Sequence, residues 1–162
     1  NIDFTGTDKV SVFAGVRKLS NGAASIVAEL SSDAGNNNGA FFLTGPGNGL
    51  GDDIFLSRGT IAISARQLAA SAPASRVVTG VSDIHGDNVK YRVNGVAIAS
   101  STADQGTGNF GNYPLYLFRR GGTSLPFNGW FYGMAITGRL TTDAETVATE
   151  RFLAAKSAVV IP

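Results

Sequence analysis

The chain has 162 residues, of which 43% are hydrophobic and only 15% charged, and its net charge is +1. This length allows one domain with a sizeable core, and the hydrophobic content excludes an intrinsically disordered chain. The scattered basic residues exclude the basic patch of a nucleic-acid-binding protein, and the absence of cysteine excludes disulfide frameworks and thiolate metal sites.

Short segments of alternating apolar and polar residues follow one another from residue 9 onward, beginning with 9–18, where every second side chain is apolar. The strands predicted after it are 25–30, 40–44, 54–58, 60–65, 76–82, 89–93, 96–100, 115–119 and 130–137. Asn-Gly pairs, which supply the positive φ angles of tight hairpin turns, begin at residues 21, 38, 48, 94 and 128. The pattern predicts an all-β fold, a two-sheet antiparallel β-sandwich of the jelly-roll type.

One helix is predicted near the end of the chain, over residues 142–156. Thr142 and Glu145 form a capping box, and Asp143 suits the positive end of the helix dipole. The apolar stripe expected to pack against the edge of the sandwich is Ala144, Val147, Ala148, Phe152 and Ala155.

Four segments in the second half resemble a known family in their order and spacing. They are Tyr-Arg-Val-Asn-Gly-Val at 91–96, Pro-Leu-Tyr-Leu-Phe at 114–118, Phe-Asn-Gly-Trp-Phe-Tyr-Gly at 127–133 and Leu-Thr-Thr-Asp-Ala-Glu at 140–145. Together they resemble the laminin-G-like branch of the concanavalin A-like lectin/glucanase superfamily, in the form found in phage and prophage tail or structural proteins. The chain departs from the family at Gly133 and Met134, where many members carry an acidic pair. This departure puts any function tied to that pair in doubt.

The resemblance implies that residues 1–162 form one laminin-G-like domain and that its function is carbohydrate or receptor recognition, on a virion or outside the cell. The sequence starts with Asn rather than Met, so we expect a fragment of a longer chain, in which no signal peptide is visible. We expect no nucleic-acid partner and no membrane span. The alternative is a structural or decoration domain of a larger particle, and a homo-oligomer or larger assembly is compatible with both.

An enzyme is the least favoured class. Glycoside hydrolases need two carboxylates that flank the scissile bond, and those of this fold share an E-x-D-x-E type of strand. The chain has three glutamates, Glu29, Glu145 and Glu150, two of them in the predicted helix, and no such motif. The sequence therefore predicts a non-catalytic module.

Sugar binding requires a planar aromatic face and a few fixed polar groups. The candidate carbohydrate-binding residues are Tyr113, Trp130, Asn109, Asn112, Arg119 and Arg120. The competing interpretation of Trp130 is core packing, because Tyr132, Met134 and Ile136 follow at spacings of two on the same predicted strand. The two arginines could hold an acidic sugar or simply be solvated.

A polar segment before the predicted strand 89–93 carries the candidate metal ligands Asp83, His85 and Asp87. Calcium prefers carboxylate and carbonyl oxygens, but the spacing does not match an EF-hand loop. The simpler interpretation is a polar turn. Asp52 and Asp53, after a glycine-rich loop, are an equally weak candidate for calcium.

Overall fold

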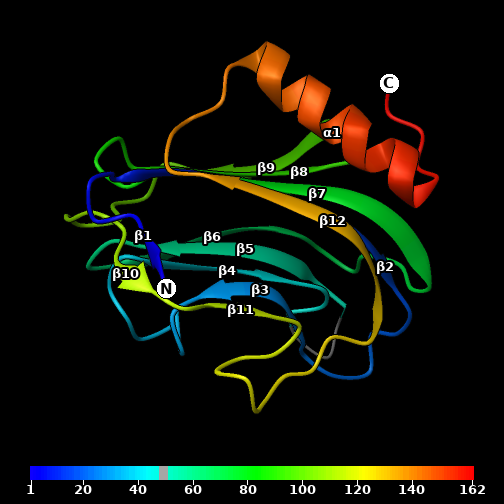
Figure 1. The fold of residues 1–162 in the computed structure, drawn as a ribbon, viewed down its shortest axis with the longest axis horizontal. Coiled ribbons are helices and arrows are strands. Elements are labelled where there is room, and N and C mark those ends of the chain that lie inside the picture. The colour runs from blue at the N-terminus through cyan, green and yellow to red at the C-terminus, as the bar shows by residue number, and fades with distance from the viewer. Residues whose placement is uncertain (48–50) are drawn as a thin grey trace.

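The computed structural model describes residues 1–47 and 51–162, so the turn predicted at Asn48-Gly49 lies outside the described residues. Two five-stranded antiparallel sheets stack face to face, and a helix covers the outer side of one of them (Figure 1). The predicted all-β sandwich with one C-terminal helix is therefore confirmed.

Sheet 1, the lower layer in Figure 1, has the strand order β11-β3-β4-β5-β6. Its strands are β3 (Ile26–Leu30), β4 (Ala40–Thr44), β5 (Asp53–Arg58), β6 (Ala62–Gln67) and β11 (Leu115–Leu117). Sheet 2 has the order β12-β2-β7-β8-β9. Its strands are β2 (Lys9–Lys18), β7 (Ala74–Asp83), β8 (Asn88–Val93), β9 (Val96–Ser101) and β12 (Gly129–Thr137). A small ribbon of β1 (Ile2–Asp3) and β10 (Asn112–Tyr113), missed by the sequence pattern, closes one end.

The core lies between the two sheets and is made by the alternating apolar residues that the sequence marks. On β2, the inward side chains are Val10, Val12, Ala14 and Val16, all buried. Phe41 and Phe55 face them from sheet 1. The hairpin predicted between β8 and β9 forms through Asn94 and Gly95, both at positive φ. Local patterning thus specified the strands and their faces, because burial of one face fixes a strand's register.

The predicted core face of β12 is wrong at its N-terminal end. Phe131 pairs with Val16 while Gly133 pairs with Gly15, so Tyr132 is an extra residue in a β-bulge. The bulge shifts the alternation by one, as bulges do. Met134 packs against the core, but Trp130 is 62% exposed.

The helix α1 (Asp143–Ser157) begins at the predicted N-cap, Thr142, with the capping box complete. It lies over the outer face of β12, β2 and β7 (Figure 1). The predicted apolar stripe is wrong, since Phe152 is 62% exposed. The residues of α1 that are buried are Glu150, Leu153, Ala154 and Ser157. This face is selected because Leu153 and Ala154 pack on Phe13 and Val77, two apolar side chains on the outer face of sheet 2.

Candidate functional site

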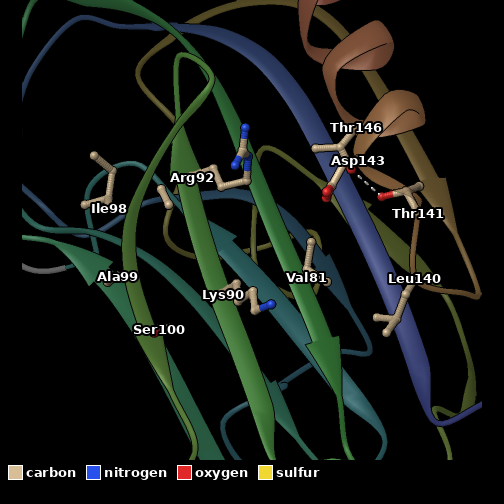
Figure 2. A pocket seen from close by; sticks show the side chains of 11 residues that line it. Val81, Lys90, Arg92, Ile98, Ala99, Ser100, Leu140, Thr141, Asp143 and Thr146 are labelled. Atoms are coloured by element: carbon tan, nitrogen blue, oxygen red, sulfur yellow. Dashed lines mark hydrogen bonds between the residues drawn. The ribbon is translucent and has the colours of Figure 1, made fainter.

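A groove of about 560 Å³ opens on the outer face of sheet 2. Figure 2 shows it between β8 and β9 on one side and the start of α1 on the other. Its lining comes from four segments and comprises Val81, Lys90, Arg92, Ala97, Ile98, Ala99, Ser100, Leu140, Thr141, Asp143 and Thr146. The volume is within the range of about 300–1,000 Å³ that is usual for small-ligand sites.

The groove exists because α1 covers only part of sheet 2. The helix packs mainly on β12, β2 and β7 and reaches β8 through the Arg92–Glu150 ion pair, so its side forms a wall above β8 and β9. The connection from β12 to α1 is fixed by Ser11, whose hydroxyl donates to the carbonyl of Arg139 at 3.0 Å and accepts from the Thr141 amide at 3.2 Å. Thr141 and Thr146 then share a hydrogen bond at 2.8 Å. The wall beside the groove is therefore anchored to the sheet.

The floor of the groove carries two cations from β8. Val89, Tyr91 and Val93 point into the core, which turns Lys90 and Arg92 outward. Lys90 is exposed, and within the described ranges its ammonium has no ion-pair or hydrogen-bond partner. Arg92 is instead held by Glu150 of α1, with 2.8 Å between Nε and Oε1.

Apolar side chains flank these charges. Arg92 pairs with Ala97 and Tyr91 with Ala99, so Ile98 is an extra residue in a β-bulge and lines the groove with both of its neighbours. Leu140 faces the strands from the opposite wall (Figure 2). Ile98 and Leu140 are 40% and 39% exposed, respectively. The groove thus offers a free ammonium, the Asp143 carboxylate, hydroxyl groups and two apolar contacts, a combination that suits a polyhydroxylated, partly apolar ligand.

None of the six residues predicted to bind carbohydrate lines the groove. Three of them lie at the end of the sandwich that β1 and β10 close. The hydroxyl of Tyr113 donates to the backbone carbonyl of Asn38 at 3.0 Å, and the side-chain amide of Asn109 donates to the backbone carbonyl of Thr5 at 2.7 Å. Asn112 lies on β10 and its carbonyl accepts from the side chain of Asn1. These contacts stabilise the end of the sandwich at which β1 and β10 lie.

The two arginines follow β11, at the edge of sheet 1. Arg119 is exposed, whereas Arg120 is used internally. The Arg120 guanidinium lies 3.1 Å from the buried carboxylate of Glu29 and 3.4 Å from Asp33. It also lies over the ring of Phe42, 5.7 Å from the centroid. Trp130, near the start of β12, is 62% exposed and pairs with Arg17 of β2.

The sequence contained one signal for the groove. The segment 89–93 alternates apolar and basic residues, which places Lys90 and Arg92 on one face of a strand. Nothing local indicates that α1 lies beside that face, because the helix is about fifty residues away in the chain. The six residues predicted to bind carbohydrate lie instead on or just before β10, after β11 and on β12.

The candidate metal ligands serve the turn in which they lie. Asp83 accepts from the amide of Gly86 at 2.9 Å and pairs with Lys9 at 3.2 Å. Asp87 accepts from the amide of Gln105 at 2.8 Å, and His85 is exposed. In residues 1–47 and 51–162, no three His, Cys, Asp or Glu side chains form a group that could hold a metal ion. Calcium binding stays a prediction.

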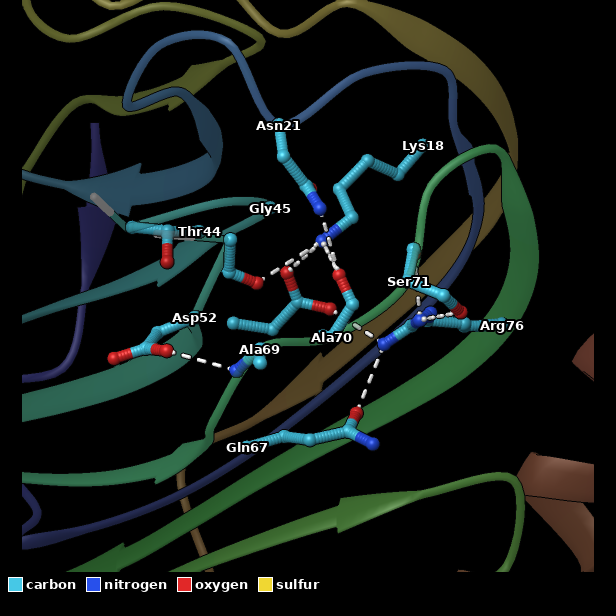
Figure 3. Close-up of polar contacts among 12 residues, drawn as sticks. Lys18, Asn21, Thr44, Gly45, Asp52, Gln67, Ala69, Ala70, Ser71 and Arg76 are labelled. Atoms are coloured by element: carbon cyan, nitrogen blue, oxygen red, sulfur yellow. Dashed lines mark hydrogen bonds and ion pairs between the residues drawn. The ribbon is translucent and has the colours of Figure 1, made fainter. Parts of the chain in front are cut away.

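The second calcium candidate, at Asp52 and Asp53, lies in a buried polar cluster that includes Lys18 and Arg76 (Figure 3). Asp53 lies between two cations, 2.7 Å from Lys18 Nζ and 2.8 Å from Arg76 Nη1. Lys18 also donates to the carbonyls of Ala70 at 3.1 Å and Gly51 at 3.4 Å. Burial raises the pKa of the Asp53 carboxyl and lowers the pKa of the Lys18 ammonium. The cluster joins β2 and β7 of sheet 2 to β5 of sheet 1, so its role is to clamp the two layers.

No protein-family model and no curated protein matches the sequence. Solved structures do match. The CBM40 module of the Ruminococcus gnavus IT-sialidase superposes with a TM-score of 0.66 at 22% identity, covering 88% of this chain and 82% of that one. The NanB sialidase from Streptococcus pneumoniae gives 0.67 at 18% identity, covering 87% of this chain but only 24% of that chain. The binding domain of botulinum neurotoxin DC gives 0.66 at 14% identity, with coverages of 92% and 36%.

At these identities the similarities show the fold alone, a β-sandwich of the kind seen in the R. gnavus CBM40 module. The chain matches a carbohydrate-binding module over most of that module's length, and it spans about a quarter of the sialidase. In the described ranges no helix is long and apolar enough to cross a bilayer.

Proposed function

We propose that this protein is a non-catalytic glycan-recognition module whose ligand-binding site is the groove between α1 and β8–β9. The observation that carries the proposal is an exposed, unpartnered ammonium, Lys90, on the floor of a groove of ligand size with apolar walls. Lys90 would bind an acidic group of the glycan. Asp143, at the rim, would accept hydrogen bonds from sugar hydroxyls, and Ile98 and Leu140 would contact apolar ring faces.

The comparisons support an acidic sugar as the ligand. The R. gnavus CBM40 module has been solved bound to α2,3 sialyllactose and to α2,6 sialyllactose, and the botulinum neurotoxin DC domain in complex with SialylT. A sialylated glycan carries one carboxylate beside many hydroxyls, which matches a groove with one free cation. We therefore propose sialylated glycans, on a cell surface or receptor, as the first ligands to test.

The non-catalytic part of the proposal is supported by the state of the three glutamates. Glu29 and Glu150 are buried in ion pairs with Arg120 and Arg92, and Glu145 belongs to the capping box of α1. A glycosidase needs two carboxylates on either side of one bond. The glutamates of this chain are each committed to a different structural contact.

We also propose that the module acts outside the cell or on a virion, where glycans are accessible. The sequence motifs that resemble laminin-G-like domains of phage tail proteins support a setting of this kind. The alternative, a decoration domain without a small ligand, is an outcome of the experiment below.

The test is titration of the protein with 3′-sialyllactose and with lactose, followed by calorimetry and by NMR of Lys90 and Ser100, in EDTA and in calcium. We expect selective binding of the acidic glycan and at least a tenfold loss of affinity in Lys90→Gln, because charge-assisted hydrogen bonds contribute about 1.5–3 kcal/mol. Lys156→Gln is the matched control, since Lys156 is exposed on α1 and outside the groove lining.

Equal loss in both lysine variants, or binding that maps away from the groove, would contradict the site. No binding of either sugar by the folded protein would contradict the function and favour the decoration domain, which light scattering would then test as self-assembly. A calcium requirement would instead support a calcium site at the predicted ligands Asp83 and Asp87.

A further inference from the structure

Glu150 lies on the face of α1 that packs against sheet 2, and its side chain is only 1% exposed. Oε1 accepts from Arg92 Nε at 2.8 Å and from the hydroxyl of Thr79 at 2.9 Å, and Oε2 accepts from Arg92 Nη2 at 3.0 Å. The helix thus carries a buried carboxylate directly behind the groove.

Arg92 has most of its hydrogen-bonding capacity occupied in this arrangement. Its Nη2 also donates to the carbonyl of Gly95 at 2.7 Å, so Nη1 alone has no hydrogen-bond partner in the part of the chain that the structure describes. The hydrogen bond to Glu150 raises the pKa of the Arg92 guanidinium, and the charges of Glu150 and Asp143 act in the same direction. The charge of Arg92 is therefore compensated even though its side chain is 25% exposed in the groove.

Lys90 differs from Arg92 in this respect. Both point outward from β8 and both line the groove, but the ammonium of Lys90 is exposed and has no such partner within the described ranges. The groove therefore contains two basic side chains and one uncompensated cation. An anion that enters it meets the attraction of Lys90 alone rather than of a pair of cations, and the Asp143 carboxylate at the rim weakens that attraction further.

We infer that Glu150 is a specificity-determining residue of the groove, which cancels the charge of Arg92 and so prevents the groove from binding simple anions. Two adjacent uncompensated cations would attract any sulfate or phosphate. One cation gives a weak site that becomes strong only when the rest of a ligand fits the walls. Specificity of this kind comes from making the wrong ligand unfavourable. The exclusion of simple anions does not depend on the proposed function, whereas its consequence for glycan binding rests on that function.

The test uses inorganic sulfate as the probe and the variant Glu150→Gln, which keeps the shape of the side chain and removes its charge. Sulfate is titrated into the protein at constant ionic strength, and the NMR signals of the Arg92 Nε–H and the Lys90 amide report binding. We expect Glu150→Gln to bind sulfate about tenfold more tightly than the wild type, because a unit charge within several ångströms is only partly screened. The Arg92 Nε–H should also exchange faster with solvent.

Two further variants separate charge from packing. Glu150→Asp keeps the negative charge and should leave sulfate binding as weak as in the wild type. The double variant R92Q/E150Q removes the pair as a neutral unit, which buried ion pairs tolerate better than loss of one partner. It should also leave sulfate binding weak, and should change 3′-sialyllactose affinity by less than about twofold.

Sulfate binding by Glu150→Gln no tighter than that of the wild type would overturn the inference, as would equally tight binding by Glu150→Asp. If Glu150→Gln does not fold, the double variant decides through sulfate, since sulfate binding by R92Q/E150Q clearly weaker than that of the wild type would show that Arg92 acts as a free cation. Because the sulfate measurements need no glycan, failure of the glycan proposal and failure of this inference give different results.

Discussion

Replacing Lys18 with Met tests whether the buried cluster clamps the two sheets. The side chain of Lys18 is 1% exposed, and Nζ lies 2.7 Å from Asp53 Oδ1. Methionine has a similar length and fills the same space without the charge. The substitution leaves Asp53 with Arg76 as its remaining cation and removes a donor from two loop carbonyls, those of Gly51 and Ala70.

The expected cost follows from these contacts. Breaking a buried ion pair by removing one partner costs about 3–5 kcal/mol. Arg76 still neutralises Asp53, which favours the lower end, so we expect a loss of about 3 kcal/mol in the free energy of unfolding. For a chain of this size, that corresponds to a fall in Tm of about 6–12 °C.

The assay is urea unfolding followed by tryptophan fluorescence and by circular dichroism, with Lys156→Met as the exposed control. The control should stay within about 0.5 kcal/mol of the wild type. A loss below about 1 kcal/mol in Lys18→Met would refute the reasoning. It would mean that the desolvation of Lys18, which lowers its pKa, offsets nearly all of its attraction to Asp53.

Two further predictions concern the capping of α1 and the spacing of the sheets. The hydrogen bond from Arg139, followed by that from the Thr142 amide, lowers the pKa of Glu145 to about 2 from its ordinary 4.5. Its stabilising effect should therefore be complete above pH 4.5 and disappear as the pH falls toward 2, so the stability difference between wild type and Glu145→Gln should vanish over that interval in acid titrations followed by circular dichroism. Gly80→Ala places a methyl group against the Phe55 ring of the facing sheet and should cost about 1–3 kcal/mol in urea unfolding, whereas Gly22→Ala, with open space around it, should cost far less; equal losses would contradict the close approach.

The strands of this protein could be predicted from sequence because their signals are local. Alternation along β2 sets which side chains face the core, and Asn94-Gly95 supplies the turn geometry of its hairpin. The same locality explains the wrong core face predicted for the start of β12. A single extra residue, Tyr132, inverts the alternation of β12 and exposes Trp130. The alternation of apolar and polar residues in the sequence does not reveal where such a bulge occurs.

The buried face of α1 was unpredictable for a different reason. Phe152 belongs to the apolar stripe, yet the helix buries Glu150 instead. That choice depends on Arg92 and Thr79, both more than fifty residues away in the sequence, because they donate hydrogen bonds to the buried Glu150 carboxylate. A buried carboxylate is costly without such partners, so sequence reasoning that ignores long-range pairing assigns the wrong face.

The groove and the docking of α1 are consequences of the same contact. The apolar part of the helix interface is formed by Leu153 and Ala154 against Phe13 and Val77, and the Glu150–Arg92 ion pair adds a polar contact between the helix and β8. The same pair determines how much charge the floor of the groove presents. A substitution that repositions α1 would therefore alter both the shape of the wall and the charge below it. Since Lys90 has no hydrogen bond or ion pair to any described residue, we expect its substitution to leave the fold intact and to test the proposed ligand binding alone.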